Sequence, residues 1–439
     1  MRTITTFIST CIVAAALAQG PTSLSLHQAM DLAAQQSYAV QASDLEAQKA
    51  EAKIKEVTAM GLPQIDGSAS LNNFIDVPTQ VIPNFFGGDP SKTTAVQFGL
   101  PWNASAGLQL NQLIYDGSYL TGLKATRALH TKNQQDLEKA RVDARVQAAK
   151  SYLGVLAARE GARLAAESVP VLEKSQSEAN AMLQAGFMEQ TDVDRLTIAL
   201  VSARDRASSF AQQERVALAF LRLVLGIPTD SPIGLTDQLE NIMNDASETS
   251  LIGMTLDLNG HIDHQLAQSI MALQELDVRN QKSAYQPKLY GFFSHQQQTY
   301  TQEFNLNGPW YPATLWGLDL KVPIFSSGMR SSRVKQARLT LDQTAVNLTA
   351  TEQRLMAEAQ ERTEKVRTAE QTYHTQNQNL ELSKRILDRT SIKFTNGLTS
   401  SFELNQDQSQ YLQAQQAYIG SLVDLLVART DLRKALDLY

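Results

Sequence analysis

The sequence predicts a mainly α-helical chain with a membrane β-barrel portion, built from two internal repeats. Three observations support this prediction: two very long helical runs, two pairs of amphipathic strands set between helices, and a repeated order of these elements. Aromatic residues make up 7% of the 439 residues, while Ala, Gln and Leu are frequent, which suits long helices better than a broad β core. The net charge is −6 and no basic block stands out, so we expect no nucleic-acid partner.

Two long stretches carry the strongest helical signal. The first runs from Ser118 to about Gln184 and would be about 100 Å long as one helix, although its single proline, Pro170, can kink or interrupt it. The second runs from Ser327 to about Thr395 without proline. Apolar residues recur at coiled-coil spacing and predict two packing seams: Leu137, Ala144, Ala148, Tyr152 and Val155, then Val366, Tyr373, Leu380, Leu387 and Phe394. Shorter helical patterns cover Leu26–Met60, Thr191–Leu225, Ile262–Ala284 and Ser400–Leu438.

Strand-like blocks interrupt the helices twice. In the first block, apolar residues alternate with polar ones, and the polar positions are Gln64, Asp66, Ser68, Asn103, Ser105 and Gln109. A loop rich in Pro, Gly and Asp is expected between these two strands, at about Val77 to Thr94. The second block pairs Leu289–Gln297 with Thr314–Ile324. Each strand has about ten residues, which matches the strands of a transmembrane β-barrel.

A soluble, half-buried sheet shows the same alternation and is the alternative interpretation. Each hairpin, however, stands between long helices with nothing to pack on unless it joins others. In lipid the backbone groups at its edges must be paired, which requires a closed barrel. Four strands are too few for a pore, so several copies are expected to contribute, and a trimer would supply about 12 strands. Aromatic residues suited to the outer rim of such a barrel are Trp102, Trp310, Tyr311 and Trp316.

The start of the chain is predicted to be a secretory signal peptide. Arg2 gives the positive start, Phe7 to Ala18 is a short apolar run, and Ala16-Leu17-Ala18 is a cleavage site, so Gln19 is expected to begin the mature chain. The single cysteine, Cys11, lies in this segment, so neither a disulfide nor a cysteine metal site is expected. No other stretch is apolar for long enough to suggest a transmembrane helix, which leaves a soluble chain or a β-barrel.

The order helix, hairpin, long helix, glycine turn, helix occurs twice and indicates a duplicated unit. These residues resemble the TolC-like outer-membrane efflux protein family over nearly the whole mature chain. The resemblance rests on the order and duplication of short pieces: Ser25-Leu26-His27-Gln28-Ala29, Leu62-Pro63-Gln64, Ile114-Tyr115-Asp116-Gly117, Pro323-Ile324-Phe325-Ser326-Ser327-Gly328, and the paired turns at Ala185-Gly186-Phe187 and Asn396-Gly397-Leu398.

The resemblance implies a homotrimer. Its 12-stranded β-barrel would lie in the outer membrane of a Gram-negative bacterium and continue into a long coiled-coil α-helical barrel in the periplasm. A periplasmic adaptor protein and an inner-membrane transporter are the implied partners. The chain would then begin with a signal peptide (1–18). Repeat one would consist of an entry helix (19–61), a membrane hairpin (62–115) and tunnel helices (116–226). After an irregular equatorial segment (227–260), repeat two would consist of an entry helix (261–285), a membrane hairpin (286–325) and tunnel helices (326–439).

No catalytic constellation, phosphate-binding loop or metalloprotease motif is present, so neither an enzyme nor a cofactor is predicted. His261 and His264 are three residues apart and resemble half of a metal site. They lack a cysteine and an evident third ligand. We therefore interpret them as surface or helix-start histidines and predict no metal.

Two acids, Asp192 and Glu403, each stand six residues after a turn glycine. In a trimer they would form stacked rings of carboxylates that attract cations. The resemblance implies that both line a pore constriction. The alternative is helix capping, because Ser400 and Glu403 fit a capping box and Asp192 follows Thr191 in a first helical turn.

The turn residues Gly186, Phe187, Gly397 and Leu398 are the candidate adaptor contacts, as the resemblance implies. The alternative is a helix hairpin with a hydrophobic cap. Family members often place an aromatic, a basic residue and a further acid around the second turn as locks. Here Phe394, Thr399 and Gln406 stand at those places, so the sequence departs from that lock.

The predicted function is a passive duct in the outer membrane, one component of a tripartite efflux or type I secretion system. The energy would come from the inner-membrane transporter, because the chain has no nucleotide motif. The alternative is a soluble periplasmic coiled-coil adaptor or structural protein, which leaves the amphipathic hairpins unexplained. A third hypothesis, an exported enzyme, lacks candidate residues.

Overall fold

The computed structural model describes residues 22–83, 91, 93–243 and 251–439. The chain divides into two compact units. The first unit comprises Met1–Glu46, Gln134–Ala267 and Leu348–Tyr439, and the second comprises Ala47–Asn133 and Gln268–Asn347. The predicted signal peptide (1–18), with Cys11 and the cleavage site before Gln19, lies outside the described residues.

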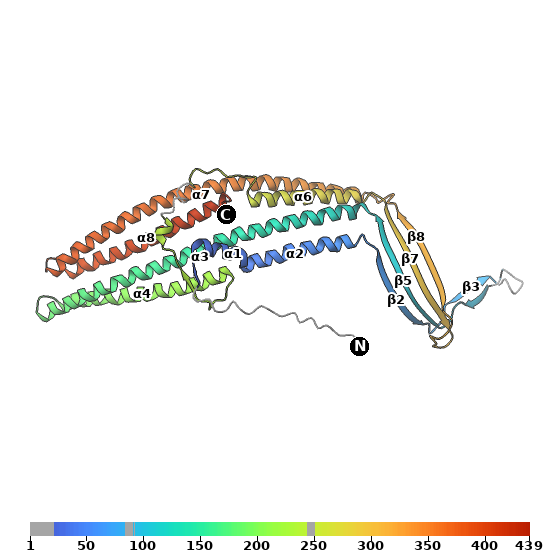
Figure 1. Ribbon diagram of the computed structural model, residues 1–439, viewed down its shortest axis with the longest axis horizontal. Helices are drawn as coiled ribbons and strands as arrows, with labels where there is room; N and C mark the ends of the chain where they lie inside the picture. Colours follow the sequence, from blue (N-terminus) through green and yellow to red (C-terminus); the bar gives the residue numbers. More distant parts are fainter. Residues whose placement is uncertain (1–21, 84–90, 92, 244–250) are drawn as a thin grey trace, which may run out of the picture. The chain divides into compact units, whose positions relative to one another are not determined.

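The chain is mainly helical, as the sequence predicts, and Figure 1 labels most of its elements. The helices of the described part are α1 (Leu26–Gln36), α2 (Tyr38–Ala59), α3 (Gly117–Gln184), α4 (Gln190–Leu225), α5 (Leu239–Met243), α6 (Ile262–Ser283), α7 (Met329–Thr395) and α8 (Ser401–Ala435). Pro170 lies inside α3, which continues through it. None of these helices combines the length and the apolar character needed to cross a bilayer.

The prediction of one helix over Leu26–Met60 is wrong, because Ser37 divides it into α1 and α2. Ser37 has extended backbone angles (φ −60°, ψ 148°), and its hydroxyl accepts a hydrogen bond from the Val40 N–H at 3.4 Å. Gly226, which ends α4 with φ +71°, packs closely here: a Cβ on it would lie 2.1 Å from the Gln36 carbonyl oxygen. The break therefore depends on a tertiary contact as well as on a local cap.

The core of the first unit follows the two predicted seams. All five seam residues of α3 are at most 8% exposed, and so are Val366, Leu387 and Phe394 of α7. Tyr373 and Leu380 are half-buried against the same core. These narrow stripes of small and apolar residues let long, otherwise polar helices pack along their length.

Tyr152 joins this core to the start of the chain. Its ring is fully buried, and its hydroxyl donates to the Leu24 carbonyl oxygen at 2.8 Å and lies 3.1 Å from Asp237 Oδ2. Burial raises the pKa of Tyr152 to about 12, so the phenol keeps its proton at neutral pH and serves as a donor.

The predicted irregular segment 227–260 contains regular structure. Strand β6 (Ile233–Leu235) pairs in parallel with β1 (Thr22–Leu24), and α5 follows it. The pairing was not predictable from local pattern, since each strand has three residues and the two are far apart in sequence. Residues 244–250 of this segment lie outside the described part.

The second unit contains a four-stranded antiparallel sheet in the order β2-β5-β7-β8. Its strands are β2 (Gln64–Asn73), β5 (Trp102–Tyr115), β7 (Lys288–Thr301) and β8 (Tyr311–Lys321). The register puts the six predicted polar residues of β2 and β5 on one face, where the Ser70 and Ser105 hydroxyls lie 2.8 Å apart. The opposite face carries the apolar row Ile65, Leu110, Phe293 and Trp316. Strands β2 and β5 therefore have one polar and one apolar face, as alternation predicts, whereas β7 places Phe292 on the polar face and His295 and Gln297 on the other.

Three details of the strand prediction are wrong. The expected loop at Val77–Thr94 contains strand β3 (Thr79–Pro83) and the start of β4 (Thr93–Gln97), and these two strands pair as a small hairpin. Strand β8 ends at Lys321 rather than Ile324, because Pro323 cannot donate to a ladder. Trp316 pairs with Phe293 within the sheet and does not lie at the end of the strand with Tyr311.

Replacing Tyr152 with Phe should destabilise the first unit by about 0.5–1.5 kcal/mol, because the hydrogen bond from its hydroxyl to the Leu24 carbonyl is lost while that carbonyl still accepts from the Thr236 N–H. Tyr38→Phe is the matched control, since Tyr38 is 57% exposed. Thermal unfolding followed by circular dichroism of the helices measures both variants. An unchanged midpoint for Tyr152→Phe would contradict this role of the hydroxyl.

Candidate functional site

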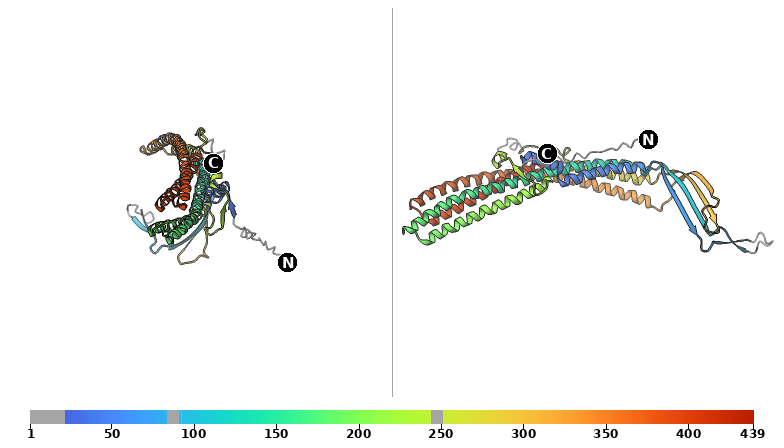
Figure 2. Two further views of the ribbon diagram at one scale, coloured as in Figure 1. Left: turned by 90° about the vertical axis from the view of Figure 1, so that its left-hand side faces the viewer. Right: turned by 60° about the horizontal axis from the view of Figure 1, so that its bottom comes forward.

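The tips of two helical hairpins lie together in the first unit. Residues 185–189 join α3 to α4, residues 396–400 join α7 to α8, and Figures 1 and 2 show both turns at the same end of the unit. Six buried side chains from all four helices form one cluster behind the turns: Ala179, Val193, Leu196, Leu387, Phe394 and Leu404. This cluster holds the two tips in a fixed relation to each other.

Both turns have the same backbone geometry, a Schellman motif. In the first, the Gly186 N–H donates to the Leu183 carbonyl at 3.0 Å and the Phe187 N–H donates to the Met182 carbonyl at 2.9 Å. The second turn repeats the pattern at Gly397 and the residue after it. The two glycines have φ +79° and +70°, a left-handed conformation that suits glycine. The two turns, which correspond in sequence, therefore also have the same backbone conformation.

Phe187 and Leu398 follow these glycines and project from the tips. They are 85% and 76% exposed, respectively. In a hydrophobic cap, the residue at this position packs back on the last turn of its own helix. Such high exposure does not fit that alternative, so each tip presents an apolar side chain that the described residues leave uncovered.

Asp192 lies in the first turn of α4 and is half-buried. Its Oδ1 accepts a hydrogen bond from the Ser401 hydroxyl on α8, and Arg195 Nη1 lies 3.3 Å from the same oxygen. Glu189, the N-cap of α4, makes no side-chain cap bond. Asp192 therefore joins the two hairpins at their tips in addition to standing where the helix dipole favours an acid.

Glu403 lies in the first turn of α8 and is exposed. Ser400 caps this helix, because its hydroxyl accepts from the Glu403 N–H at 3.3 Å. The Glu403 carboxylate itself accepts from the Thr399 hydroxyl. Half of the expected capping box is thus present, and the carboxylate faces solvent beside the turn.

The contact between the hairpins also involves residues that the sequence did not point to. Ser401 is 1% exposed and donates to Asp192, and the Arg195 guanidinium lies over the Phe402 ring at 5.8 Å from its centroid. Sequence reasoning identified one serine of the Ser400-Ser401 pair as a cap. The role of the second serine, Ser401, as a donor to Asp192 depends on α4 lying opposite it, which the sequence does not reveal.

The positions of the family's lock hold no equivalent network in the described structure. Phe394 is 2% exposed and belongs to the apolar cluster behind the turns. Thr399 is bonded to Glu403, and Gln406 is exposed. The Asp192–Ser401 hydrogen bond is the polar link that joins the two hairpins here.

His261 and His264 stand at the start of α6, as one part of the prediction states, but they are buried, so the part that placed them on the surface is wrong. His261 and His264 are 4% and 3% exposed. His264 Nε2 lies 3.2 Å from Glu352 Oε1, and His261 Nδ1 accepts from the Asp263 N–H at 3.1 Å. Burial opposes ionisation of Asp263, but the hydrogen bond and charge of Lys139 outweigh it and hold the pKa of this carboxyl below its ordinary value. Across the described ranges, no three potential ligands lie together to hold a metal ion.

Comparison with known proteins then decides the family. A model of the outer membrane efflux protein family matches residues 29–227 and 263–437. The chain belongs to this family. Its location is therefore the outer membrane of a Gram-negative bacterium, and nothing supports the soluble-adaptor alternative. A search of curated protein sequences finds no match.

Solved structures share the fold of this outer-membrane efflux protein. CusC is 17% identical with a TM-score of 0.72, and the match covers 96% of this chain and 95% of CusC. The open state of the Neisseria gonorrhoeae MtrE outer membrane channel is 15% identical with a TM-score of 0.71, covering 94% and 88%. The Campylobacter jejuni CmeC outer membrane channel is 16% identical with a TM-score of 0.69, covering 94% and 85%. The predicted fold class is confirmed by these likenesses.

Proposed function

We propose that this chain is one subunit of a homotrimeric duct that carries substrates across the outer membrane without changing them covalently. The observation that carries the proposal is the four-stranded sheet, in which β2 and β5 carry polar residues on one face and apolar residues on the other, and which has an open edge on each side. CmeC and MtrE, which share this fold, are outer membrane channels.

The open edges explain why copies must combine. Strands β2 and β8 each pair with a neighbour on one side only within this sheet. Unsatisfied backbone groups in lipid cost several kcal/mol each, so an isolated sheet of this kind is not viable there. Three copies supply twelve strands, enough to close a barrel with the polar faces of β2 and β5 inside and the apolar faces toward lipid.

The two acids at the helix tips are proposed to line the constriction of this duct. Six carboxylates, from Asp192 and Glu403 of three copies, would lie near one level, because the tips of one chain are packed together. The Asp192–Ser401 hydrogen bond would hold the hairpins of each copy in the narrow arrangement. Rings of carboxylates focus cations. Gating would then consist of the two hairpins separating at this end.

Conductance across planar lipid bilayers tests the duct and its constriction together. The purified protein should give discrete openings that favour cations, and Asp192→Asn with Glu403→Gln should move the reversal potential in a salt gradient toward zero. Asp194→Asn is the control, because Asp194 belongs to the same helical turn and is bonded to Gln190 at 2.9 Å. Verified insertion without openings would refute the duct, and unchanged selectivity in the double variant would refute the acidic rings.

The apolar tips are proposed to dock a periplasmic adaptor, which would connect the duct to an inner-membrane transporter. Phe187 and Leu398 are exposed, flank glycine turns of identical geometry and recur in both repeats. A ring of three copies would present six such side chains. The buried core of a protein interface is more apolar than the rest of the surface and is enriched in aromatic residues such as Phe.

Replacing Phe187 and Leu398 with Ser should therefore abolish export from cells while leaving the bilayer conductance of the purified protein unchanged. The matched control is Ile75→Ser, because Ile75 is 94% exposed but belongs to the other unit. Cellular accumulation of an exported dye measures the effect. Normal export by the double variant, at equal protein level, would exclude the tips as the docking site.

A further inference from the structure

Apolar side chains are exposed beside both edge strands of the sheet, at the end where these strands continue into helices. Val322, Ile324 and Phe325 in the segment after β8 are 54%, 93% and 83% exposed. Met60 and Leu62 in the segment before β2 are 55% and 56% exposed. We propose that the exit segment (322–325) of one copy docks on the entry segment (60–63) of the next and forms an apolar collar at this end of the barrel. The inference rests on the proposed trimer and adds a contact outside the strand pairing.

The entry segment is held in place by its own unit. The Gly61 carbonyl accepts from Gln112 Nε2 at 2.8 Å, and the Tyr119 hydroxyl donates to the Thr58 carbonyl at 3.2 Å. The Tyr119 ring presses on the turn so closely that a Cβ on Gly61 would lie 2.3 Å from its hydroxyl oxygen. The backbone is thus fixed, while Leu62 stays exposed on a positioned turn.

The exit segment is held in the same way. Arg330 Nη1 donates to the Pro323 carbonyl at 3.1 Å, and its guanidinium lies over the Tyr285 ring at 5.7 Å from the centroid. The two residues after Pro323 nevertheless remain almost fully exposed. A contact surface that is already ordered loses little entropy on binding. Neither segment contains a charged residue, so the two surfaces match in polarity.

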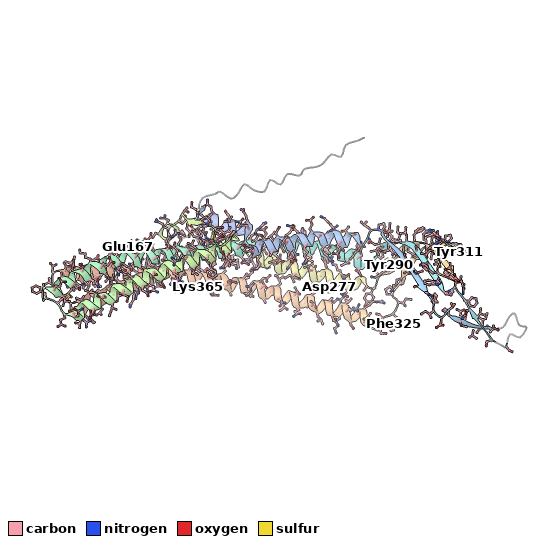
Figure 3. The ribbon with its side chains drawn as sticks, turned by 90° about the horizontal axis from the view of Figure 1, so that it is seen from below. Glu167, Asp277, Tyr290, Tyr311, Phe325 and Lys365 are labelled. Atoms are coloured by element: carbon pink, nitrogen blue, oxygen red, sulfur yellow. The ribbon has the colours of Figure 1, made fainter. Side chains whose placement is uncertain are left out.

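The direction of the strands brings the two segments together. Every pairing in the four-stranded sheet is antiparallel, so β2 and β8 run in opposite directions. In a ring of copies, the end of β8 at Lys321 therefore meets the start of β2 at Gln64 of the next copy. Figure 3 shows Phe325 toward the end of the sheet where Tyr290 lies, and Tyr311 toward the other end.

The stagger of the strands supports the same juxtaposition. The row of paired residues that begins at Gln64 passes through Asn111 and Phe292 to Gly317, and β8 continues four residues beyond this row, from 318 to 321. Closing tilted strands into a barrel requires a stagger of this kind. The entry segment of the next copy then lies beside the last residues of β8 and the exit segment that follows them.

Disulfide cross-linking in the full chain tests the collar. Leu62→Cys combined with Ile324→Cys, oxidised with copper phenanthroline in outer membranes, should convert the monomer band into covalent dimers and trimers on a non-reducing gel. Cys11 does not interfere, because it is the single natural cysteine and lies in the predicted signal peptide. Since a disulfide needs Cα atoms within about 7 Å, Met60→Cys with Phe325→Cys covers a shift of register.

Ile75→Cys with Ile324→Cys is the matched control and should stay monomeric, because Ile75 is 94% exposed but lies beyond the other end of β2. If native mass measurement finds trimers but neither test pair forms cross-links, the collar is refuted and the proposed duct is not. A monomeric chain would overturn both. A spin label on Ile324→Cys should be shielded from oxygen in the trimer; high oxygen accessibility would assign this surface to lipid instead.

Discussion

The backbone hydrogen bonds at the two edges of the four-stranded sheet constrain the rest of the structure. Within the sheet, β2 and β8 each have a neighbour on one side only, and the polar and apolar residues of β2 and β5 lie on opposite faces. Water satisfies such edges in a soluble protein, whereas a bilayer cannot. Both edges of this sheet therefore need partners in a bilayer, and the proposed trimer would supply them from other chains. The proposed trimer, the inward polar faces and the collar all follow from that requirement.

The helical unit meets a different constraint, since long helices with few large apolar residues must pack along narrow seams. Buried alanines and the fully buried Tyr152 serve this packing in α3, and Val366 serves it in α7. At the tips the apolar cluster is supplemented by a polar link, Ser401 to Asp192. A link of that kind is weaker than core packing and easier to break, which suits the gating proposed for this end.

Much of this fold was predictable because its signals are local. The alternation in β2 and β5, the heptad spacing in α7 and the two glycine turns each lie within a few residues of one another. The errors concern contacts between residues that are distant in sequence. Gly226 packs against the helix break at Ser37, and β1 pairs with β6 about 200 residues further along the chain. The buried state of His264 likewise depends on Glu352, and the bond of Asp192 on Ser401, neither of which spacing reveals.

The mass of the purified, detergent-solubilised protein tests the central claim most directly. If edge pairing between copies completes the sheet, native mass spectrometry should find three chains in each particle, with no stable single chain at concentrations where the protein remains folded. A folded, monodisperse monomer would mean that β2 and β8 are satisfied within one chain. That result would contradict the central claim that strands of other copies complete the sheet.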